Sequence, residues 1–144
     1  MPNLLLTGAA GFTGQHFTEA AQLAGYKVLP LIADLTDAKA VASEIAASAP
    51  DYVVHLAAIS AITHMDEEAF YRVNLFGTQN LLKALAALPN APKRVLLASS
   101  SNVYGNALLS PIDESTCPGP VNHYSISKLA MERLTCMFAD RLAM

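Results

Sequence analysis

The sequence predicts an α/β protein with a doubly wound parallel sheet. Short apolar runs of strand length alternate with longer segments whose apolar residues have helical spacing, which is typical of βαβ units. Three glycines, Gly8, Gly11 and Gly14, follow the first apolar run at i, i+3 and i+6. The 144 residues, 53% of them apolar and 15% charged, suit one domain with a sizeable core.

Each element follows from local pattern. The strands are expected at residues 3–6, 26–32, 51–56 and 93–98. Pro30 lacks a backbone donor, so the second strand should lie at a sheet edge or bend near it. The first helix is expected to end at Gly25 and the second near Pro50. The third and fourth helices are expected to span residues 66–88 and 123–142. Thr36 or Asp37 can cap the second helix.

Small or polar residues follow all four expected strands. They are Gly8–Gly14, Asp34, Ala57–Ala58 and Ser99–Ser101. Ligands of parallel α/β sheets bind at the carboxyl ends of the strands. We therefore expect these four segments to meet at one ligand-binding edge.

The glycine-rich segment between the first strand and the first helix has the spacing of a phosphate-binding turn. Gly8 would permit a tight turn, Gly11 a close approach to a pyrophosphate, and Gly14 close packing of helix and strand. The helix N-terminus would offer N–H groups to the phosphates. The alternative is a helix-capping turn that binds no ligand.

Tyr124 and Lys128 lie four residues apart at the start of the last expected helix and so share one face. An ammonium beside a phenol favours the phenolate, which suits a general acid/base for a hydroxyl or ketone. Ser99–Ser101 could hydrogen-bond the same oxygen. The alternatives are a surface pair for the first two residues and a polar turn for the serines.

Several motifs in one order give the chain a strong resemblance to the extended short-chain dehydrogenase/reductase family, the nucleotide-sugar epimerases, dehydratases and reductases. They are Thr7-Gly-x-x-Gly-x-x-Gly14, Asp34-Leu35, His55-Leu56-Ala57-Ala58, Asn74-Leu75-Phe76-Gly77-Thr78, Ser99–Gly105 and Tyr124-x-x-x-Lys128. The resemblance covers nearly the whole chain. It implies a Rossmann domain that binds NAD or NADP and acts on a nucleotide-activated sugar by hydride transfer.

The resemblance also implies roles for individual residues. Tyr124 would be the catalytic acid/base, Lys128 its partner on the nicotinamide ribose, and Ser100 the catalytic hydroxyl. Asn74 would brace the site, or is simply a buried helix amide. The implied cofactor-binding residues are Gly8, Gly11, Phe12, Thr13, Gly14, Asp34, Leu35, Leu56, Ala57, Ala58, Asn74, Ser99, Tyr124 and Lys128. His55 is given no role.

Some positions depart from the family pattern. Ser101 and Asn102 stand where sugar dehydratases usually carry acidic residues, which disfavours a 4,6-dehydratase and leaves an epimerase or a 4-keto-sugar reductase. Asp34 could contact the adenosine ribose, 20 residues after Gly14, or the adenine, since it begins an Asp-Leu pair. No arginine precedes Arg72, so a 2′-phosphate clamp is not evident and NAD is favoured, with NADP still open.

Family members are roughly twice as long as this chain. Residues 1–144 are therefore expected to form the NAD(P)-binding Rossmann domain of a truncated or degenerate enzyme, without the substrate-binding domain. A non-catalytic dinucleotide-binding module is the alternative function. In relatives the helices equivalent to residues 66–88 and 123–142 form a dimer interface, so a homodimer is expected here too.

Bulk properties exclude other classes. The net charge is −3 and no basic cluster occurs, which argues against nucleic acid. Cys117 and Cys136 lack metal-ligand spacing and give no reason to infer a disulfide, so a reducing cytoplasm fits. No apolar run approaches the ~18 residues of a membrane span. His64 and His123 have no clustered partners, so no metal site is expected.

Overall fold

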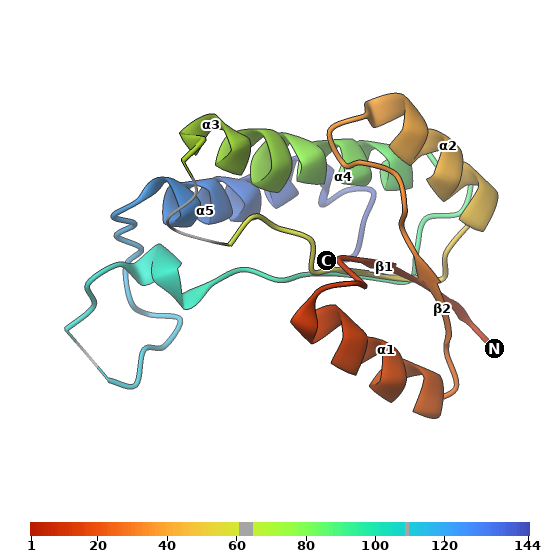
Figure 1. Cartoon of the computed structure of the whole chain (residues 1–144), viewed down its shortest axis with the longest axis horizontal. Coiled ribbons are helices and arrows are strands. Elements are labelled where there is room, and N and C mark those ends of the chain that lie inside the picture. Colours follow the sequence, from red (N-terminus) through yellow and green to blue (C-terminus); the bar gives the residue numbers. More distant parts are fainter. Residues whose placement is uncertain (61–64, 109) are drawn as a thin grey trace.

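A computed structural model describes residues 1–60, 65–108 and 110–144, and His64 lies outside the described residues. Four parallel strands form one sheet in the order β2-β1-β3-β4: β1 (Asn3–Thr7), β2 (Lys27–Pro30), β3 (Tyr52–His55) and β4 (Arg94–Leu97). Helix α1 (Phe12–Leu23) covers one face (Figure 1). Helices α2 (Ala38–Ser48), α3 (Glu67–Phe70), α4 (Thr78–Ala86) and α5 (His123–Thr135) lie on the other. The predicted doubly wound parallel fold is confirmed.

Pro30 lies on an edge strand, as predicted. It pairs with Leu6 of β1, and the following residue, Leu31, donates its N–H to the Leu6 carbonyl at 2.9 Å. Because β2 has a neighbour only on the β1 side, the missing donor of Pro30 breaks no ladder in the described sheet.

The strands bury apolar side chains on both faces of the sheet. Leu5, Val53 and Val95 pack with the α4 leucines, of which Leu81 is fully buried. Leu4, Leu6 and Val54 form a second cluster on the α1 side. Successive strand residues point to opposite faces, so near-continuous apolar runs are what a sheet covered on both sides requires.

Helix α2 begins at an aspartate cap. The Asp37 carboxylate accepts hydrogen bonds from the backbone N–H groups of Lys39 and Ala40, both at 3.0 Å. Of the two caps that the sequence allowed, Asp37 is therefore the one used. The hydroxyl of Thr36 instead donates to Asp34.

Replacing Asp37 by alanine is expected to lower the free energy of unfolding by about 1 kcal/mol, because two N–H groups of the first turn lose their acceptor. The matched variant Thr36→Ala leaves the cap in place and should change stability by less than about 0.5 kcal/mol. Urea denaturation measures both values. Equal effects of the two variants would contradict the assignment of the cap.

The helix predicted over residues 66–88 is continuous but not uniform. Asp66 caps α3, a π-helical segment, η1 (Tyr71–Gly77), follows, and α4 ends at Ala86. Such π segments are frequent at functional sites. Among the described residues, no helix has both the length and the apolar character that crossing a membrane requires.

The prediction of a helix up to residue 142 was wrong. Helix α5 ends at Thr135 and continues as the short 3₁₀ helix η3 (Cys136–Phe138). The chain must leave the helix there, because Leu142 returns to the core and the Ala143 carbonyl accepts the N–H of Val95 at 2.8 Å.

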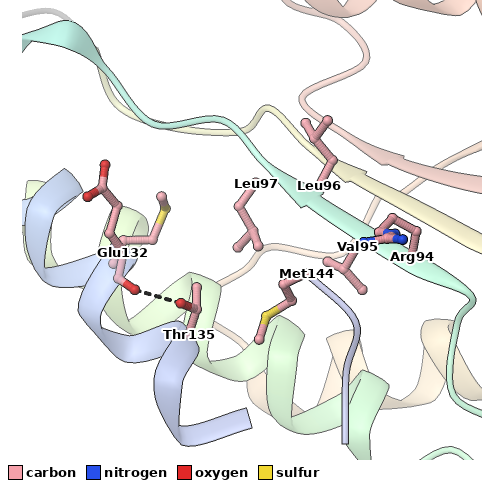
Figure 2. Close-up of a pocket in the computed structure, with 8 residues that line it drawn as sticks. Arg94, Val95, Leu96, Leu97, Glu132, Thr135 and Met144 are labelled. Atoms are coloured by element: carbon pink, nitrogen blue, oxygen red, sulfur yellow. Dashed lines mark hydrogen bonds between the residues drawn. The ribbon is translucent and has the colours of Figure 1, made fainter. Parts of the chain in front are cut away.

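Strand β4 is the other edge of the described sheet, and an apolar groove of about 380 Å³ runs along it (Figure 2). Met144 and the α5 residues Glu132 and Thr135 form its far wall. Leu96 points to the opposite face, where its side chain is 53% exposed.

Candidate functional site

The parallel register brings the four strand ends to one edge of the sheet, as predicted. Thr7 at the end of β1 pairs with His55 at the end of β3, and His55 pairs with Leu97 at the end of β4. The segments that follow these residues therefore leave the sheet side by side. They carry most of the residues that the sequence singled out.

The glycine-rich turn has the backbone that its spacing predicted. Gly8 has a φ of +72°, and a Cβ there would lie 2.7 Å from the Ala57 nitrogen. A Cβ on Gly14 would overlap the carbonyl oxygen of Gly8. Gly11 is the N-cap residue of α1 and has an ordinary φ of −74°, and the one heavy atom within 4 Å of its missing Cβ is the Gly8 oxygen at 3.3 Å. Gly8 and Gly14 are thus required by the turn itself, whereas Gly11 leaves open the space above the helix N-terminus.

A groove of about 610 Å³ lies between this turn and the end of β2. Its walls are Gly8–Ala10, the α1 residues Gln15, Thr18 and Glu19, and Pro30–Ile32. An open groove next to a glycine turn and a helix N-terminus fits the phosphate and ribose of a dinucleotide. Phe12 and Thr13 lie exposed in the first turn of α1 and are not among the residues that line this groove.

Asp34 is exposed beyond the end of β2 and does not line that groove. Its carboxylate accepts the N–H and the hydroxyl of Thr36, both at 2.8 Å, and these bonds lower the pKa of Asp34. The side chain of Leu35 is in the core, and its carbonyl accepts a hydrogen bond from Asn80 of α4. The pair therefore lies on the α4 side of the sheet edge.

A buried polar chain supports the segment after β3. The Thr7 hydroxyl lies 2.6 Å from His55 Nδ1 and accepts the N–H of Ala57 at 3.0 Å. His55 Nε2 lies 2.8 Å from the hydroxyl of Thr78, which in turn donates to the Asn74 carbonyl. Thr78 therefore accepts from Nε2–H, and Nδ1 accepts from Thr7. Burial, with a smaller contribution from the charge of Lys128, lowers the pKa of His55 to about 3.

The amide of Asn74 connects three elements. From the π segment η1, its Oδ1 accepts the N–H of Ile59 at 2.8 Å, and its Nδ2 donates to the Ile59 carbonyl at 3.0 Å. The same Nδ2 reaches the Ser127 hydroxyl of α5 at 3.1 Å. Asn74 is 1% exposed, so it ties the end of the β3 segment, which begins with Leu56, Ala57 and Ala58, to α5.

The serines after β4 have separate partners. Ser100 caps the 3₁₀ turn η2 (Ser101–Tyr104), where its hydroxyl oxygen accepts the Asn102 N–H at 3.2 Å. Its hydroxyl hydrogen can still be donated. Ser99 donates its hydroxyl to the carboxylate of Glu132 on α5. Ser99–Ser101, Ile112–Glu114 and Glu132 line a hollow of about 410 Å³.

Helix α5 carries Tyr124 and Lys128 from a firmly fixed start. Asn122 and Ser125 form a reciprocal capping box, a pattern that the sequence analysis overlooked. The Tyr124 ring is 9% exposed and lies 6.2 Å from the ring of Phe70. The turn η2, with Ser100 at its cap, packs against this helix.

Lys128 is buried, and its Nζ donates to the Ala98 carbonyl at 2.5 Å. The Met131 sulfur lies 3.5 Å from the same nitrogen. Burial lowers the pKa of Lys128 to about 8, and the charge of Glu132 acts in the opposite direction. An ammonium has three N–H donors and only one oxygen acceptor here within the described part of the chain, so it can still donate to a ligand.

No group of three or more His, Cys, Asp or Glu side chains that could hold a metal occurs in the described ranges. A glycine turn at a helix N-terminus, an open groove beside it and a buried lysine at the same sheet edge together define a dinucleotide-binding α/β domain of the Rossmann type.

Residues 4–141 match the NAD dependent epimerase/dehydratase family, and the chain belongs to this family. The resemblance seen in the sequence motifs is thereby confirmed. The GDP-6-deoxy-D-talose 4-dehydrogenase of Aggregatibacter actinomycetemcomitans is 36% identical over 91% of this chain and 46% of its own length.

Solved structures agree. The UDP-glucose 4-epimerase of Thermotoga maritima, determined with UDP-glucose, superposes with a TM-score of 0.87 at 25% identity over 96% of this chain and 51% of that one. RMD from Pseudomonas aeruginosa, determined with NADPH, has a TM-score of 0.83 at 33% identity over 97% of this chain and 49% of that one. The chain thus spans about half the length of the relatives it matches.

Proposed function

We propose that residues 1–144 form the NAD(P)-binding domain of an epimerase or oxidoreductase that acts on a nucleotide-activated sugar. The observation that carries this proposal is the buried ammonium of Lys128, which lies one helical turn after Tyr124 and is fixed to the end of β4 by Ala98. Burial of a charged lysine in a mainly apolar environment is energetically unfavourable, and such lysines are typical of functional sites. The substrate-binding domain is proposed to lie outside these residues.

In this proposal, Tyr124, Ser100 and Lys128 move and hold one proton. Tyr124 as phenolate accepts the proton of a sugar hydroxyl, and Ser100 orients that oxygen by donating its free hydroxyl hydrogen. The Lys128 ammonium stabilises the phenolate and donates to a ribose hydroxyl of the cofactor. The nicotinamide, when bound, supplies the hydride chemistry. The substrate oxygen would enter from the 410 Å³ hollow beside Ser100.

For the cofactor, we propose NAD, with the pyrophosphate above Gly11 and the adenosine ribose in the 610 Å³ groove. Glu19 is the charged residue among those that line the groove, and a carboxylate repels a 2′-phosphate. Asp34 and Leu35 lie on the α4 side, away from this groove, which favours the adenine as their partner over the ribose. Ala57, Ala58 and Asn74 would support the groove from the β3 side.

The reaction type remains an epimerisation or a reduction, because both need only reversible hydride transfer and this proton path. Ser101 and Asn102 cannot replace the acidic residues of a dehydratase. A dinucleotide-binding module without turnover is the second candidate.

We also propose a homodimer through the helical layer over residues 66–88 and 123–142. Helices α3, η1 and α5 pack side by side there, and Phe76 and Ile126 keep 52% and 40% of their surfaces exposed. Such apolar exposure is common at subunit interfaces. A cytoplasmic location is proposed because Cys117 and Cys136 are both free.

Calorimetric titration of this chain with NAD⁺, NADH, NADP⁺ and NADPH tests the proposal. A Kd of about 1 to 100 µM for the NAD forms is expected. Gly11→Val should weaken binding at least about tenfold, because its side chain fills the space above the helix N-terminus. A valine is compatible with the φ of −74° at this position, and its Cβ would lie 3.3 Å from the Gly8 oxygen, so circular dichroism is used to establish that the variant is folded.

Gln22→Val is the matched control. It adds the same β-branched residue to exposed surface on α1, far from the glycine turn, and should bind as the unchanged protein does. Failure of a folded chain to bind any of the four dinucleotides would refute the proposal. Equal binding by the Gly11→Val variant would refute the placement of the pyrophosphate.

A further inference from the structure

Glu132 lies on α5 where this helix meets the end of β4, and no motif pointed to it. It follows Lys128 by four residues on α5, so the two side chains share one face of the helix. Its carboxylate accepts the hydroxyl of Ser99 at the end of β4. It also lines both the 410 Å³ hollow beside Ser100 and the groove along β4, as Figure 2 shows for the latter.

Few ionisable groups face Lys128. From β3 comes His55, which is neutral, and from the strand end comes the uncharged Ala98 carbonyl. On α5 itself, Tyr124 lies one turn before Lys128 and Glu132 one turn after it. In the described ranges, Glu132 is the acidic group whose charge acts on the ammonium of Lys128.

We propose that Glu132 is a positioning residue that keeps the Lys128 ammonium charged at the cofactor site and ties the end of β4 to α5. The inference rests on the proposed function, since it concerns the same site. Burial alone drives a lysine toward its neutral form, which could neither stabilise a phenolate nor donate three hydrogen bonds. The negative charge of Glu132, one helical turn away, opposes this loss of the Lys128 charge and does not occupy the space of the ligand.

The bond to Ser99 adds a geometric role. Ser99 directly precedes Ser100, so anchoring its hydroxyl to α5 fixes the distance between the catalytic serine and the helix that carries Tyr124. The charge and the hydrogen bond can be separated experimentally. Glu132→Gln removes the charge and keeps an acceptor for Ser99, whereas Ser99→Ala removes the hydrogen bond and keeps the charge.

The test is an NMR titration of the Lys128 Cε resonance in the free chain, together with calorimetric binding of NAD⁺ at pH 7.5. Glu132→Gln should lower the midpoint of the Lys128 titration by about one pH unit. It should also weaken NAD⁺ binding about three- to tenfold. Glu132→Asp, which keeps the charge, should preserve more than half of the midpoint difference. Glu68→Gln removes an exposed carboxylate of α3 that lines neither the hollow nor the groove along β4, and should leave both values unchanged.

Ser99→Ala should leave the midpoint within about 0.3 units, because the charge of the carboxylate one helical turn after Lys128 remains. A midpoint that Glu132→Gln does not move would overturn the proposal, and so would an equal shift in Ser99→Ala. The NMR arm needs no cofactor. If the unchanged chain binds none of the dinucleotides, a shift in Glu132→Gln still supports the control of Lys128 while the proposed function fails.

Discussion

Lowering the pH from 7 to 5 is expected to reduce the free energy of unfolding by about 2 kcal/mol through His55 alone. Its ring is 1% exposed, and its pKa is lowered to about 3, mainly by burial and further by the charge of Lys128. In the unfolded chain His55 binds a proton near pH 6.5, whereas in the folded chain it stays neutral at this pH. Stability from this group is therefore complete above pH 6.5 and is lost progressively as the pH falls toward 3.

The hydrogen bonds of His55 give the same sign. Thr78 donates to the Asn74 carbonyl, so it accepts from Nε2–H, and the acceptor Nδ1 is satisfied by the hydroxyl of Thr7. A proton on Nδ1 would turn that acceptor into a donor and disrupt its hydrogen bond with the Thr7 hydroxyl. The same hydroxyl accepts the N–H of Ala57. The complete difference between pH 6.5 and 3 corresponds to about 5 kcal/mol.

Urea denaturation at pH 7, 6 and 5 measures the slope. The acidic groups with lowered pKa, Asp34, Asp51, Asp66 and Asp113, titrate below this window. His16→Asn, on the exposed face of α1, is the control for replacing a histidine elsewhere in the chain. His55→Phe should remove most of it, at the expense of lower stability at pH 7. A constant free energy of unfolding between pH 7 and 5 would contradict the assignment.

Local patterns predicted the parts of the fold that depend on local physics. The glycine spacing indicated a tight turn at Gly8 and close packing at Gly14. Gly8 has a φ of +72°, and a Cβ on Gly14 would overlap the carbonyl oxygen of Gly8. Pro30 indicated an edge because the missing donor is a property of one residue. The strand ends converge because the carboxyl ends of parallel strands lie at the same edge of the sheet. None of these inferences needed knowledge of the tertiary packing of the helices against the sheet.

The supporting side chains of the site could not be predicted in this way. His55 has ordinary strand neighbours in the sequence, and its two partners, Thr7 and Thr78, lie 48 and 23 residues away. Glu132 could have been noticed by its spacing from Lys128, but its bond to Ser99 depends on how α5 meets β4. The end of α5 at Thr135 was missed because a tertiary contact of Ala143, rather than a local breaker, ends the helix.

Replacing Lys128 by methionine is expected to stabilise the fold and to impair the site at once. The folded protein lowers the pKa of this lysine to about 8 from 10.5, so holding the proton costs the folded state up to about 3 kcal/mol. Methionine has a similar length and would occupy the same apolar surroundings, which include Met131. The free energy of unfolding at pH 7 should therefore rise by about 1 to 3 kcal/mol, after the lost bond to Ala98 is counted.

The pH dependence separates this explanation from simple repacking. The folded chain binds fewer protons than the unfolded chain between pH 8 and 10.5, so the stability of the unchanged protein increases over this range. The destabilisation of the folded state by the buried charge of Lys128 is complete below pH 8 and disappears as the pH rises toward 10.5. The advantage of Lys128→Met should accordingly be largest at pH 7 and small at pH 10.5. Lys83→Met, at an exposed position of α4, should change stability by less than about 0.5 kcal/mol at either pH.

The same variant should bind NAD⁺ about ten- to a hundredfold more weakly, because a charged donor to the ribose is lost. Stability and affinity would then move in opposite directions on one substitution. A buried ammonium that destabilises the fold is retained where the site uses its charge. For a residue with a purely structural role, replacement would lower stability and leave NAD⁺ affinity unchanged. Loss of stability together with unchanged NAD⁺ affinity in Lys128→Met would assign the lysine to the structure and not to the site.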